Sequence, residues 1–394
     1  MSMAKADNTP KSAFFVIADI SGYTKFMSET EITHAKGILG ELFGAIVPVI
    51  RAPLSISGLQ GDAVFSFAFE SDVMTKHFIM DFAEQIYCTF AKLKEKMLMN
   101  TSCPCSACNN ARDLELKFVV HHGDCIVLET AGRQERAGQD VITAFRLLKN
   151  SANERTGLNA SMLISCDALR KMDMKEFFSE DEFHTENIEH IGALEYVVRD
   201  MKQALERRRN SDPIIVSPKD DLLVDEWVTT IPVSPSAAFT MCTRPDMRAR
   251  WLGADAVDLS GVNKGKVEPG TEYQCHHGDQ IFPFEIVDWR PGEYATGCYN
   301  LPGGNKVYET NEFVSMGEGT MVKVRFTKAK TDKLFGKLMS GMINKKLLGF
   351  LVPEKETRLN RLHEISQEWL AEDGGLAADQ APDLDDVAKA GAIA

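Results

Sequence analysis

Residues Ala13–Ile20 read AFFVIADI, an unbroken apolar run in which Asp19, one place from the end, is the only charged residue. Aromatic and β-branched residues dominate the run, which predicts a short buried strand. Ser21 and Gly22 then break the strand. Because an unpaired carboxylate is costly to bury, Asp19 is the first candidate for a functional residue.

Outward from this strand, the chain alternates between predicted strands and helices. The apolar spacing predicts a helix through residues 38–50, strands at 54–57 and 63–69 that form a hairpin, a long amphipathic helix at 72–99, strands at 114–121 and 124–129 that turn at Gly123, a helix at 141–150 and a short strand at 191–198. This order predicts an α+β fold of the ferredoxin-like type, with helices on one face of the sheet.

The length of 394 residues suits two domains better than one core. A charged, helix-prone stretch followed by two prolines predicts the boundary between them. The expected parts are a first domain at 12–200, a linker at 201–221, a second domain at 222–371, and a disordered tail rich in Ala, Gly and Asp at 372–394.

The second domain is predicted to hold several strands between 271 and 326, followed by a long helical segment at 332–370. Pro353 should kink or split this segment. An apolar stripe in its first half could line a lipid-sized pocket, although packing as core is the favoured interpretation. The stripe consists of Leu334, Phe335, Leu338, Met339, Met342 and Ile343.

The charge balance excludes several kinds of partner. Lys and Arg number 44 and Asp and Glu 57, for a net charge of -13. This acidity argues against a broad surface for nucleic acid or anionic membrane, but leaves a local basic region open. The sequence contains no run of 18 apolar residues, so we expect no membrane span. Residues 1–11 are polar and lack the apolar core of a signal peptide. The 9 cysteines are an odd number and fit a reducing, cytoplasmic location.

Asp62, in the predicted hairpin turn, is the second candidate residue. If Asp19 and Asp62 converge, their oxygens suit Mg²⁺ or Mn²⁺, ions that commonly also take phosphate oxygens from a substrate. Gly22 would let backbone amides approach such phosphates. The alternative interpretation is that Asp19 caps a turn and Asp62 is an ordinary hairpin residue.

Four segments together resemble the class III nucleotidyl cyclase catalytic domain, over roughly 13–198. They are DISGYT (19–24), GDAVF (61–65), VVHHG (119–123) and GQDVITAFR (138–146). The resemblance implies attack of a ribose 3′-hydroxyl on the α-phosphate of a nucleoside triphosphate, and a homodimer whose active site forms between two domains. The implied roles are metal binding for Asp19, Asp62 and the backbone of Ile20, charge stabilisation for Arg146, and nucleotide binding for Gly22, Tyr23, Thr24, Gln139 and Asp140.

The chain departs from the family's pattern at three positions. Gly58 stands where the family has its purine-selecting lysine, and Ile142 where it has its transition-state asparagine. Gln139 matches the second purine-selecting position, unless Asp140 replaces it in a shifted register. Loss of one such donor typically costs about 10²–10³ in rate. Two functions therefore stay open: a signalling protein that binds a metal–nucleotide complex or a cyclic nucleotide with little turnover, and a divergent cyclase that makes cAMP from ATP.

A cysteine cluster precedes the predicted strand at 114–121. Cys103, Cys105 and Cys108 are three thiols within six residues, a pattern typical of a soft metal such as Zn²⁺. The alternative is a loop of small buried cysteines. The candidates for a fourth ligand are Cys88, Cys125, His121 and His122.

The second half resembles the helix-grip domain of the START-like, SRPBCC superfamily. The resemblance rests on residues 227–235, Phe239 and residues 245–251, followed by the final helical segment. It implies an α+β domain in which a curved antiparallel sheet wraps a long helix and often encloses an apolar pocket. A third function is therefore a sensor or carrier of an apolar ligand.

Overall fold

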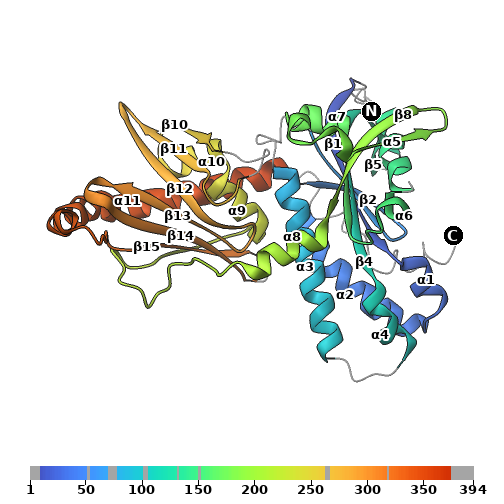
Figure 1. Cartoon of the computed structure of the whole chain (residues 1–394), viewed down its shortest axis with the longest axis horizontal. Helices are drawn as coiled ribbons and strands as arrows, with labels where there is room; N and C mark the ends of the chain where they lie inside the picture. The colour runs from blue at the N-terminus through green and yellow to red at the C-terminus, as the bar shows by residue number, and fades with distance from the viewer. Residues whose placement is uncertain are drawn as a thin grey trace, which may run out of the picture. The chain divides into compact units, whose positions relative to one another are not determined.

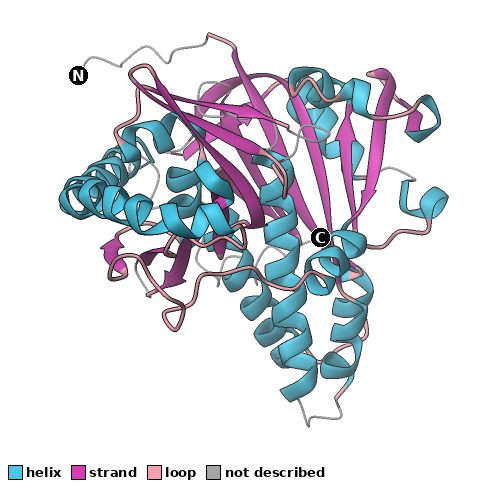
Figure 2. Cartoon of the chain, turned by 60° about the vertical axis from the view of Figure 1, so that its left-hand side comes forward, coloured by secondary structure: helices cyan, strands magenta, loops and turns pink. Residues whose placement is uncertain are grey.

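The structure, a computed structural model, describes residues 9–50, 54–69, 78–100, 105–130, 133–149, 152–261, 267–316 and 319–373. The described chain divides into two units, residues 9–211 and 212–373, each with a sheet of its own (Figures 1 and 2). The predicted disordered tail spans 372–394, and its residues from 374 onward lie outside the described residues.

The first unit is a mixed α+β structure centred on β1 (Lys11–Ser21), as expected for its class. β1 pairs antiparallel with β3 and with β4. The sheet has the order β2 (Ser55–Gln60), β3 (Ala63–Phe69), β1, β4 (Glu115–Thr130), β6 (Ser161–Ser165), β8 (Gly192–Asp200) and β7 (Phe183–Ile188), and β5 (Arg133–Ala137) pairs with β4 beside this path.

Helices cover both faces of this sheet, so the expectation of helices on one face is wrong. Phe14 and Val16 pack with α2 (Ile32–Ile50) and α3 (Phe78–Asn100). Phe15 and Ile17, which alternate with them, pack with α5 (Gln139–Leu148) on the opposite face. Burying an apolar side chain of this size stabilises the fold by roughly 1.5–3 kcal/mol, and an unbroken apolar strand gains this on both faces.

The other described helices of the first unit are α1 (Tyr23–Ser28), α4 (Ser106–Asn110), α6 (Ala152–Thr156), α7 (Cys166–Lys171) and α8 (Met201–Asn210), with short 3₁₀ turns at Ala111–Asp113, Lys175–Phe177 and Glu180–Glu182.

β4 is one continuous strand of 16 residues, so the predicted turn at Gly123 is wrong. β1 pairs straight across this position, with Ala13 opposite Gly123. The glycine serves a close approach instead: a Cβ added at Gly123 would collide with the carboxyl group of Asp140 on α5. The sequence shows a glycine but not its reason, since a turn and a tight contact both require one.

Two helices of the first unit bear on the expectations. α8 occupies the first part of the predicted linker, and its Met201 and Leu205 are buried in the core of the unit. α2 is long and apolar enough to cross a membrane by length and composition. Its apolar side chains, among them Leu39, Leu42 and Ile46, are instead packed in the core, which accounts for its hydropathy.

In its described residues, the second unit is an antiparallel sheet of seven strands with three helices. The sheet order is β10 (Ala256–Ser260), β11 (Glu272–His277), β12 (Gln280–Arg290), β13 (Tyr294–Leu301), β14 (Asn305–Ser315), β15 (Thr320–Phe326) and β9 (Trp227–Ile231). The helices are α9 (Pro235–Thr243), α10 (Pro245–Leu252) and α11 (Leu334–Asp373), and a 3₁₀ turn covers Pro302–Gly304. α9 begins with an N-cap and a first-turn proline. The hydroxyl of Ser234, the N-cap residue, accepts a hydrogen bond from the Ala237 N–H, and Pro235 is the first residue of the helix.

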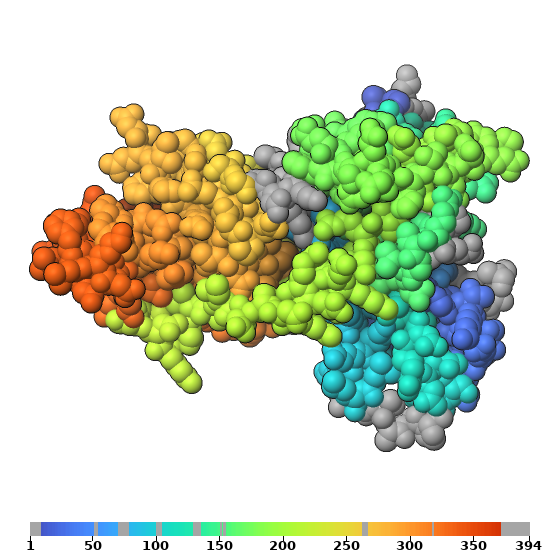
Figure 3. All heavy atoms as spheres, in the orientation of Figure 1, coloured from blue at the N-terminus to red at the C-terminus, as the bar shows by residue number. Residues whose placement is uncertain are grey.

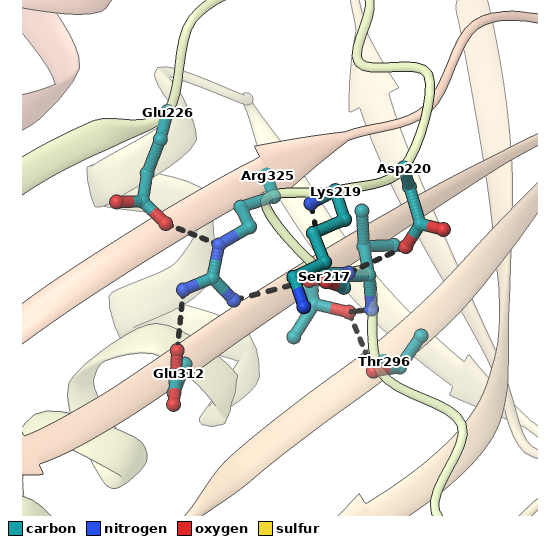
Figure 4. A network of polar contacts seen from close by, with 9 residues as sticks. Ser217, Lys219, Asp220, Glu226, Thr296, Glu312 and Arg325 are labelled. Carbon is teal, nitrogen blue, oxygen red and sulfur yellow. Dashed lines mark hydrogen bonds and ion pairs between the residues drawn. The ribbon is translucent and has the colours of Figure 1, made fainter.

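Residues 212–226 are held against this sheet by polar contacts. Arg325 on β15 forms ion pairs with Glu226 and Glu312 and donates to the carbonyl of Val216 at 3.0 Å (Figure 4). The Val216 N–H donates to the Thr310 hydroxyl at 2.9 Å. The segment is therefore part of the second unit, because its backbone groups find their partners on the sheet.

α11 runs from Leu334 to Asp373 with Pro353 inside it. Its second half is anchored, since Leu362 and Ile365 are buried. Its first half is held through Gly336, whose carbonyl accepts the Asn305 side-chain N–H at 3.1 Å, but the apolar stripe there is largely exposed: Phe335 is 70% exposed and Leu338 is 80% exposed. The favoured interpretation of this stripe as core is therefore wrong. A period of apolar residues shows that one face of a helix is apolar, but not that anything covers it.

Candidate functional site

The two candidate aspartates meet at one edge of the first sheet. Asp19 lies opposite Ala63 on β3 and opposite Lys117 on β4. Asp62 occupies the turn between β2 and β3, and its carbonyl accepts the Ile20 N–H at 3.2 Å. Strand pairing thus brings together two carboxylates that are 43 positions apart in the sequence.

This edge of the sheet has more negative than positive charge. Asp19 is buried, and its Oδ2 lies 3.0 Å from the Lys117 Nζ. The pKa of Asp62 is raised to about 6, first because burial penalises its charge and second because the Asp19 charge repels it. A hydrogen bond from its own backbone, and then the charge of Lys117, offset this increase only in part. Two carboxylates share one ammonium group, which leaves a net negative site.

The donor set fits a hard divalent cation in part. Carboxylate oxygens are what Mg²⁺ and Mn²⁺ prefer, and the second carboxylate is costly to ionise until a cation arrives. Lys117 is a competitor that the sequence analysis missed, because nothing in the sequence pairs residue 117 with residue 19. A cation at Asp19 has to share that carboxylate with the ammonium group or displace it.

Gly22 and Tyr23 lie beside this edge. Gly22 has φ 86°, and a Cβ there would approach the Asp113 carbonyl oxygen to 3.3 Å, so the position requires glycine. The pKa of Tyr23 is raised, by burial and then by the charge of Asp62, which places its phenol in the same field. Thr24, the last of this predicted group, is exposed on α1.

Arg146 lies on the outward face of α5. α5 presents Val141, Ala144 and Leu147 to the sheet, whereas Arg146 and Ile142 point outward one turn apart. Ile142 is 56% exposed, and Gln139 at the start of the helix is exposed as well. Within the ranges that the structure describes, Arg146 makes no ion pair with either aspartate or with any other acidic group.

Asp140 is engaged within the fold. Its Oδ2 accepts the Asp124 N–H at 2.7 Å, and its Oδ1 lies 3.8 Å from the Nε2 of buried His121. The pKa of Asp140 is lowered, chiefly by its contact with the His121 ring. The other nitrogen of His121 lies 2.8 Å from the Ser165 hydroxyl. Asp140 therefore holds α5 to β4, a role that the predicted nucleotide binding did not include.

The cysteine cluster acquires a different partner from those expected. Cys103 lies outside the described residues. Among the described ones, a group of possible metal ligands consists of His34, Cys105 and Cys108, whose donor atoms lie within 4.8 Å of one another. The four expected candidates, Cys88, Cys125, His121 and His122, are not in this group. His34 comes from α2, and only the packing of α4 against α2 reveals it.

Part of this unit is similar in sequence to proteins described as uncharacterised. A family model described as "Protein of unknown function (DUF2652)" matches residues 39–156. The "Uncharacterized protein Rv2561/Rv2562" of Mycobacterium tuberculosis (strain ATCC 25618 / H37Rv) is 28% identical over 112 residues, which are 28% of this chain and 51% of that protein. The chain thus spans about half the length of this curated relative.

Similar solved structures include two cyclases. The guanylyl cyclase Cya2 has 13% sequence identity and a TM-score of 0.38, covering 49% of this chain and 94% of that one. The adenylyl cyclase CyaB from P. aeruginosa has 16% identity and a TM-score of 0.36, covering 49% and 95%. Both TM-scores are below 0.5, so these similarities say nothing about the activity of this chain.

Proposed function

We propose that this protein is a cyclase-homology signalling protein that binds a divalent metal with a nucleotide at Asp19 and Asp62, with little or no turnover. The observation that carries the proposal is the raised pKa of Asp62 beside the buried carboxylate of Asp19. A fold that keeps two repelling carboxylates at one strand edge incurs an energetic cost, which a bound cation offsets. Such a metal would polarise the phosphate oxygens of the nucleotide.

The proposed weak turnover follows from two positions that lack a side-chain hydrogen-bond donor, Gly58 and Ile142. Gly58 on β2 has no other atoms within 4 Å of where its Cβ would lie, so this position offers open space and no donor to a purine. Ile142 cannot donate a hydrogen bond to a ribose. A base can be accommodated here without being selected, and a phosphate can be held without the donor that orients the sugar.

Arg146 serves such a site across a homodimer. Ile142 and Arg146 form an outward-facing pair on α5, an apolar group beside a cation. In a two-fold dimer, this face of one copy can meet the aspartate edge of the other copy. Arg146 of the first copy would then supply the positive charge that the aspartate edge lacks. Ile142→Asp should then weaken dimerisation, measured by light scattering, without affecting the fold of one copy.

The test is thermal unfolding of the full chain with Mn²⁺ and either ATP or GTP, together with assay of cyclic nucleotide. We expect nucleotide to stabilise the protein only with metal, by about 2.7 kcal/mol at 100 times Kd. Asp19→Asn and Asp62→Asn should abolish the effect, and Asp279→Asn, an exposed turn residue, should not. Absence of stabilisation in the wild type contradicts the proposal. Product that disappears in Asp62→Asn would instead establish the divergent cyclase.

The apolar-ligand function has less support. The interior of the second unit holds an ion pair between Arg248, 2% exposed, and Glu309, 1% exposed. Tyr299 donates to the same carboxylate at 2.7 Å. An interior lined with buried charges is a poor solvent for an apolar molecule, so we expect no lipid in an organic extract of the purified protein.

A further inference from the structure

The group of His34, Cys105 and Cys108 combines nitrogen and sulfur donors on two packed helices. His34 lies in the first turn of α2, and Cys105 is the N-cap of α4. The Nδ1 of His34 lies 3.0 Å from the Sγ of Cys105. Figure 1 shows α4 alongside α2, and the two helices are in contact.

The local geometry of the cysteines suits a metal. The Cys108 backbone N–H donates to the Cys105 Sγ at 3.4 Å, which holds the Cys105 thiol against the first turn of α4. The three donor atoms fall within 4.8 Å of one another. In a tetrahedral zinc site, bonds of about 2.0–2.3 Å place the ligand atoms roughly 3.3–3.8 Å apart. The 3.0 Å contact between His34 and Cys105 would lengthen slightly, and the longest separations in the group, at most 4.8 Å, would shorten, to reach these distances.

The backbone that carries the three donors is held in place by the core. Ala35, next to His34, and Ala107, between the two cysteines, are both fully buried. The Glu31 Oε2 also accepts the Ala107 N–H at 3.4 Å, which ties the start of α2 to α4. Cys108 borders a cavity of about 340 Å³, so an ion can reach the group from solvent.

We propose that His34, Cys105 and Cys108 bind a zinc ion that joins α2 to α4, a site separate from the aspartate edge. Two thiolates and an imidazole are a soft donor set, which selects Zn²⁺ over Mg²⁺. Three protein ligands leave one tetrahedral position for a further donor. The role is structural, because the ion would join α4 to α2, two helices that are already in contact.

The experiment uses the full chain, purified under reducing conditions and loaded with Zn²⁺ or with Co²⁺ as a spectroscopic probe. We expect one metal per chain and a thiolate-to-cobalt charge-transfer band. Cys105→Ser and Cys108→Ser should abolish the band, and His34→Ala should weaken binding by at least tenfold. His34→Cys should restore binding, which separates loss of a ligand from loss of fold.

Two control variants carry changes of the same kind elsewhere. Cys166→Ala and His363→Ala lie outside the group and should keep the metal. Asp62→Asn should also keep the cobalt band, so this proposal can fail or succeed independently of the nucleotide site. A wild-type protein that takes up no metal while its thiols are reduced overturns the proposal, as does a band that survives in the Cys105→Ser/Cys108→Ser double variant.

The exposed first half of α11 carries a second, independent inference. Residues 333–352 contain Lys333, Lys337, Lys345 and Lys346 and no acidic residue, in a chain whose net charge is -13. The four lysines are exposed. Leu334, Phe335, Leu338 and Met342 are exposed in the same stretch, which Figure 3 shows at the surface in orange-red.

We infer that this half of α11, residues 334–352, binds the surface of an anionic lipid bilayer. A lysine-rich helix that exposes Leu, Phe and Met has the composition of a segment that lies in the membrane interface. The charge is what selects this occupant: the helix is basic where the rest of the chain is acidic, and anionic headgroups attract lysine.

The test is sedimentation of the full chain with vesicles of phosphatidylcholine alone or mixed with phosphatidylserine. We expect binding only to the mixture, and at least tenfold weaker binding at high salt. Lys345→Glu/Lys346→Glu and Phe335→Ser/Leu338→Ser should each abolish it without affecting thermal stability, since these side chains are exposed. Lys219→Glu, elsewhere on the surface, should not. Equal sedimentation with both vesicles, or self-association through this face that excludes vesicles, overturns the inference.

Discussion

Two carboxylates of this protein, Asp19 and Glu309, each lie against a cation of their own chain, yet their surroundings differ. Glu309 is enclosed and accepts from Arg248, from Tyr299 and from Asn311. Asp19 has Lys117 and stands next to a second carboxylate, Asp62. The first arrangement is nearly satisfied and the second is short of positive charge. The comparison teaches that a buried ion pair indicates a binding site only where its charges do not balance.

The largest expected effect comes from breaking the enclosed pair. Arg248→Met should lower the free energy of unfolding of the second unit by about 3–5 kcal/mol, because it leaves Glu309 buried and unpaired. Denaturant unfolding would measure this. Arg250→Met removes an exposed arginine that pairs with Glu368 and should cost at most about 1 kcal/mol. Equal effects of the two variants would remove the distinction between enclosed and open pairs.

Lys117→Met sharpens the other side of the comparison. Without metal, Asp19 and Asp62 would face each other with no ammonium group, and we expect a loss of about 1–3 kcal/mol in stability. Mn²⁺, in contrast, should bind the variant more tightly than the wild type, because the competing ammonium group is gone. The apparent Kd for the metal should fall roughly tenfold, about 1.4 kcal/mol. Calorimetric titration of both proteins with Mn²⁺ decides the point. Metal affinity that is unchanged or weaker would mean that Lys117 does not compete.

The pH dependence of Asp62 gives a smaller effect. Its folded pKa, about 6, is above the ordinary value of 3.8, so ionisation destabilises the fold. The penalty begins as pH rises past about 4 and is complete above about 6. Asp62→Asn should therefore be more stable than the wild type at pH 7.5 by about 1 kcal/mol after solvent screening, and equal to it below pH 4. A gap that instead widens toward low pH would contradict the assignment.

Asp140 gives the smallest effect. Its folded pKa is lowered, so its ionised form stabilises the fold above the ordinary value of 3.8, and this contribution is lost as pH falls through the folded value. Asp140→Asn should cost under about 1 kcal/mol at neutral pH, because the carboxylate is partly exposed. Asp167→Asn, which removes a surface pair with Arg170, is the matched control. Thermal unfolding at pH 3 and pH 7 would show whether the difference fades in acid.

Much of the first unit could be predicted from local pattern. The run at 13–20 becomes the central strand because its side chains are apolar on both faces. The hairpin of β2 and β3 follows from the apolar run at 63–69 and the Gly61–Asp62 turn before it, although β2 continues past the predicted end at 57 to Gln60. These features depend on neighbours a few residues apart, which a sequence displays directly.

Three features of the candidate sites could not be predicted in this way. Lys117 lies against Asp19 only because of the register between β1 and β4. His34 reaches Cys105 across 71 positions because α4 packs on α2. Gly123 resembles a turn residue until α5 is placed against it.

The sequence by itself determined which residues carry charge, which soft donors cluster, and where apolar side chains recur with the period of a strand or a helix. Tertiary structure alone decided which carboxylates share a cation, which histidine joins the cysteines, and that the stripe at the start of α11 stays exposed. The reason is physical. Periodicity fixes the face on which a side chain lies, but pKa, coordination and burial depend on groups brought within a few ångströms by contacts between distant segments.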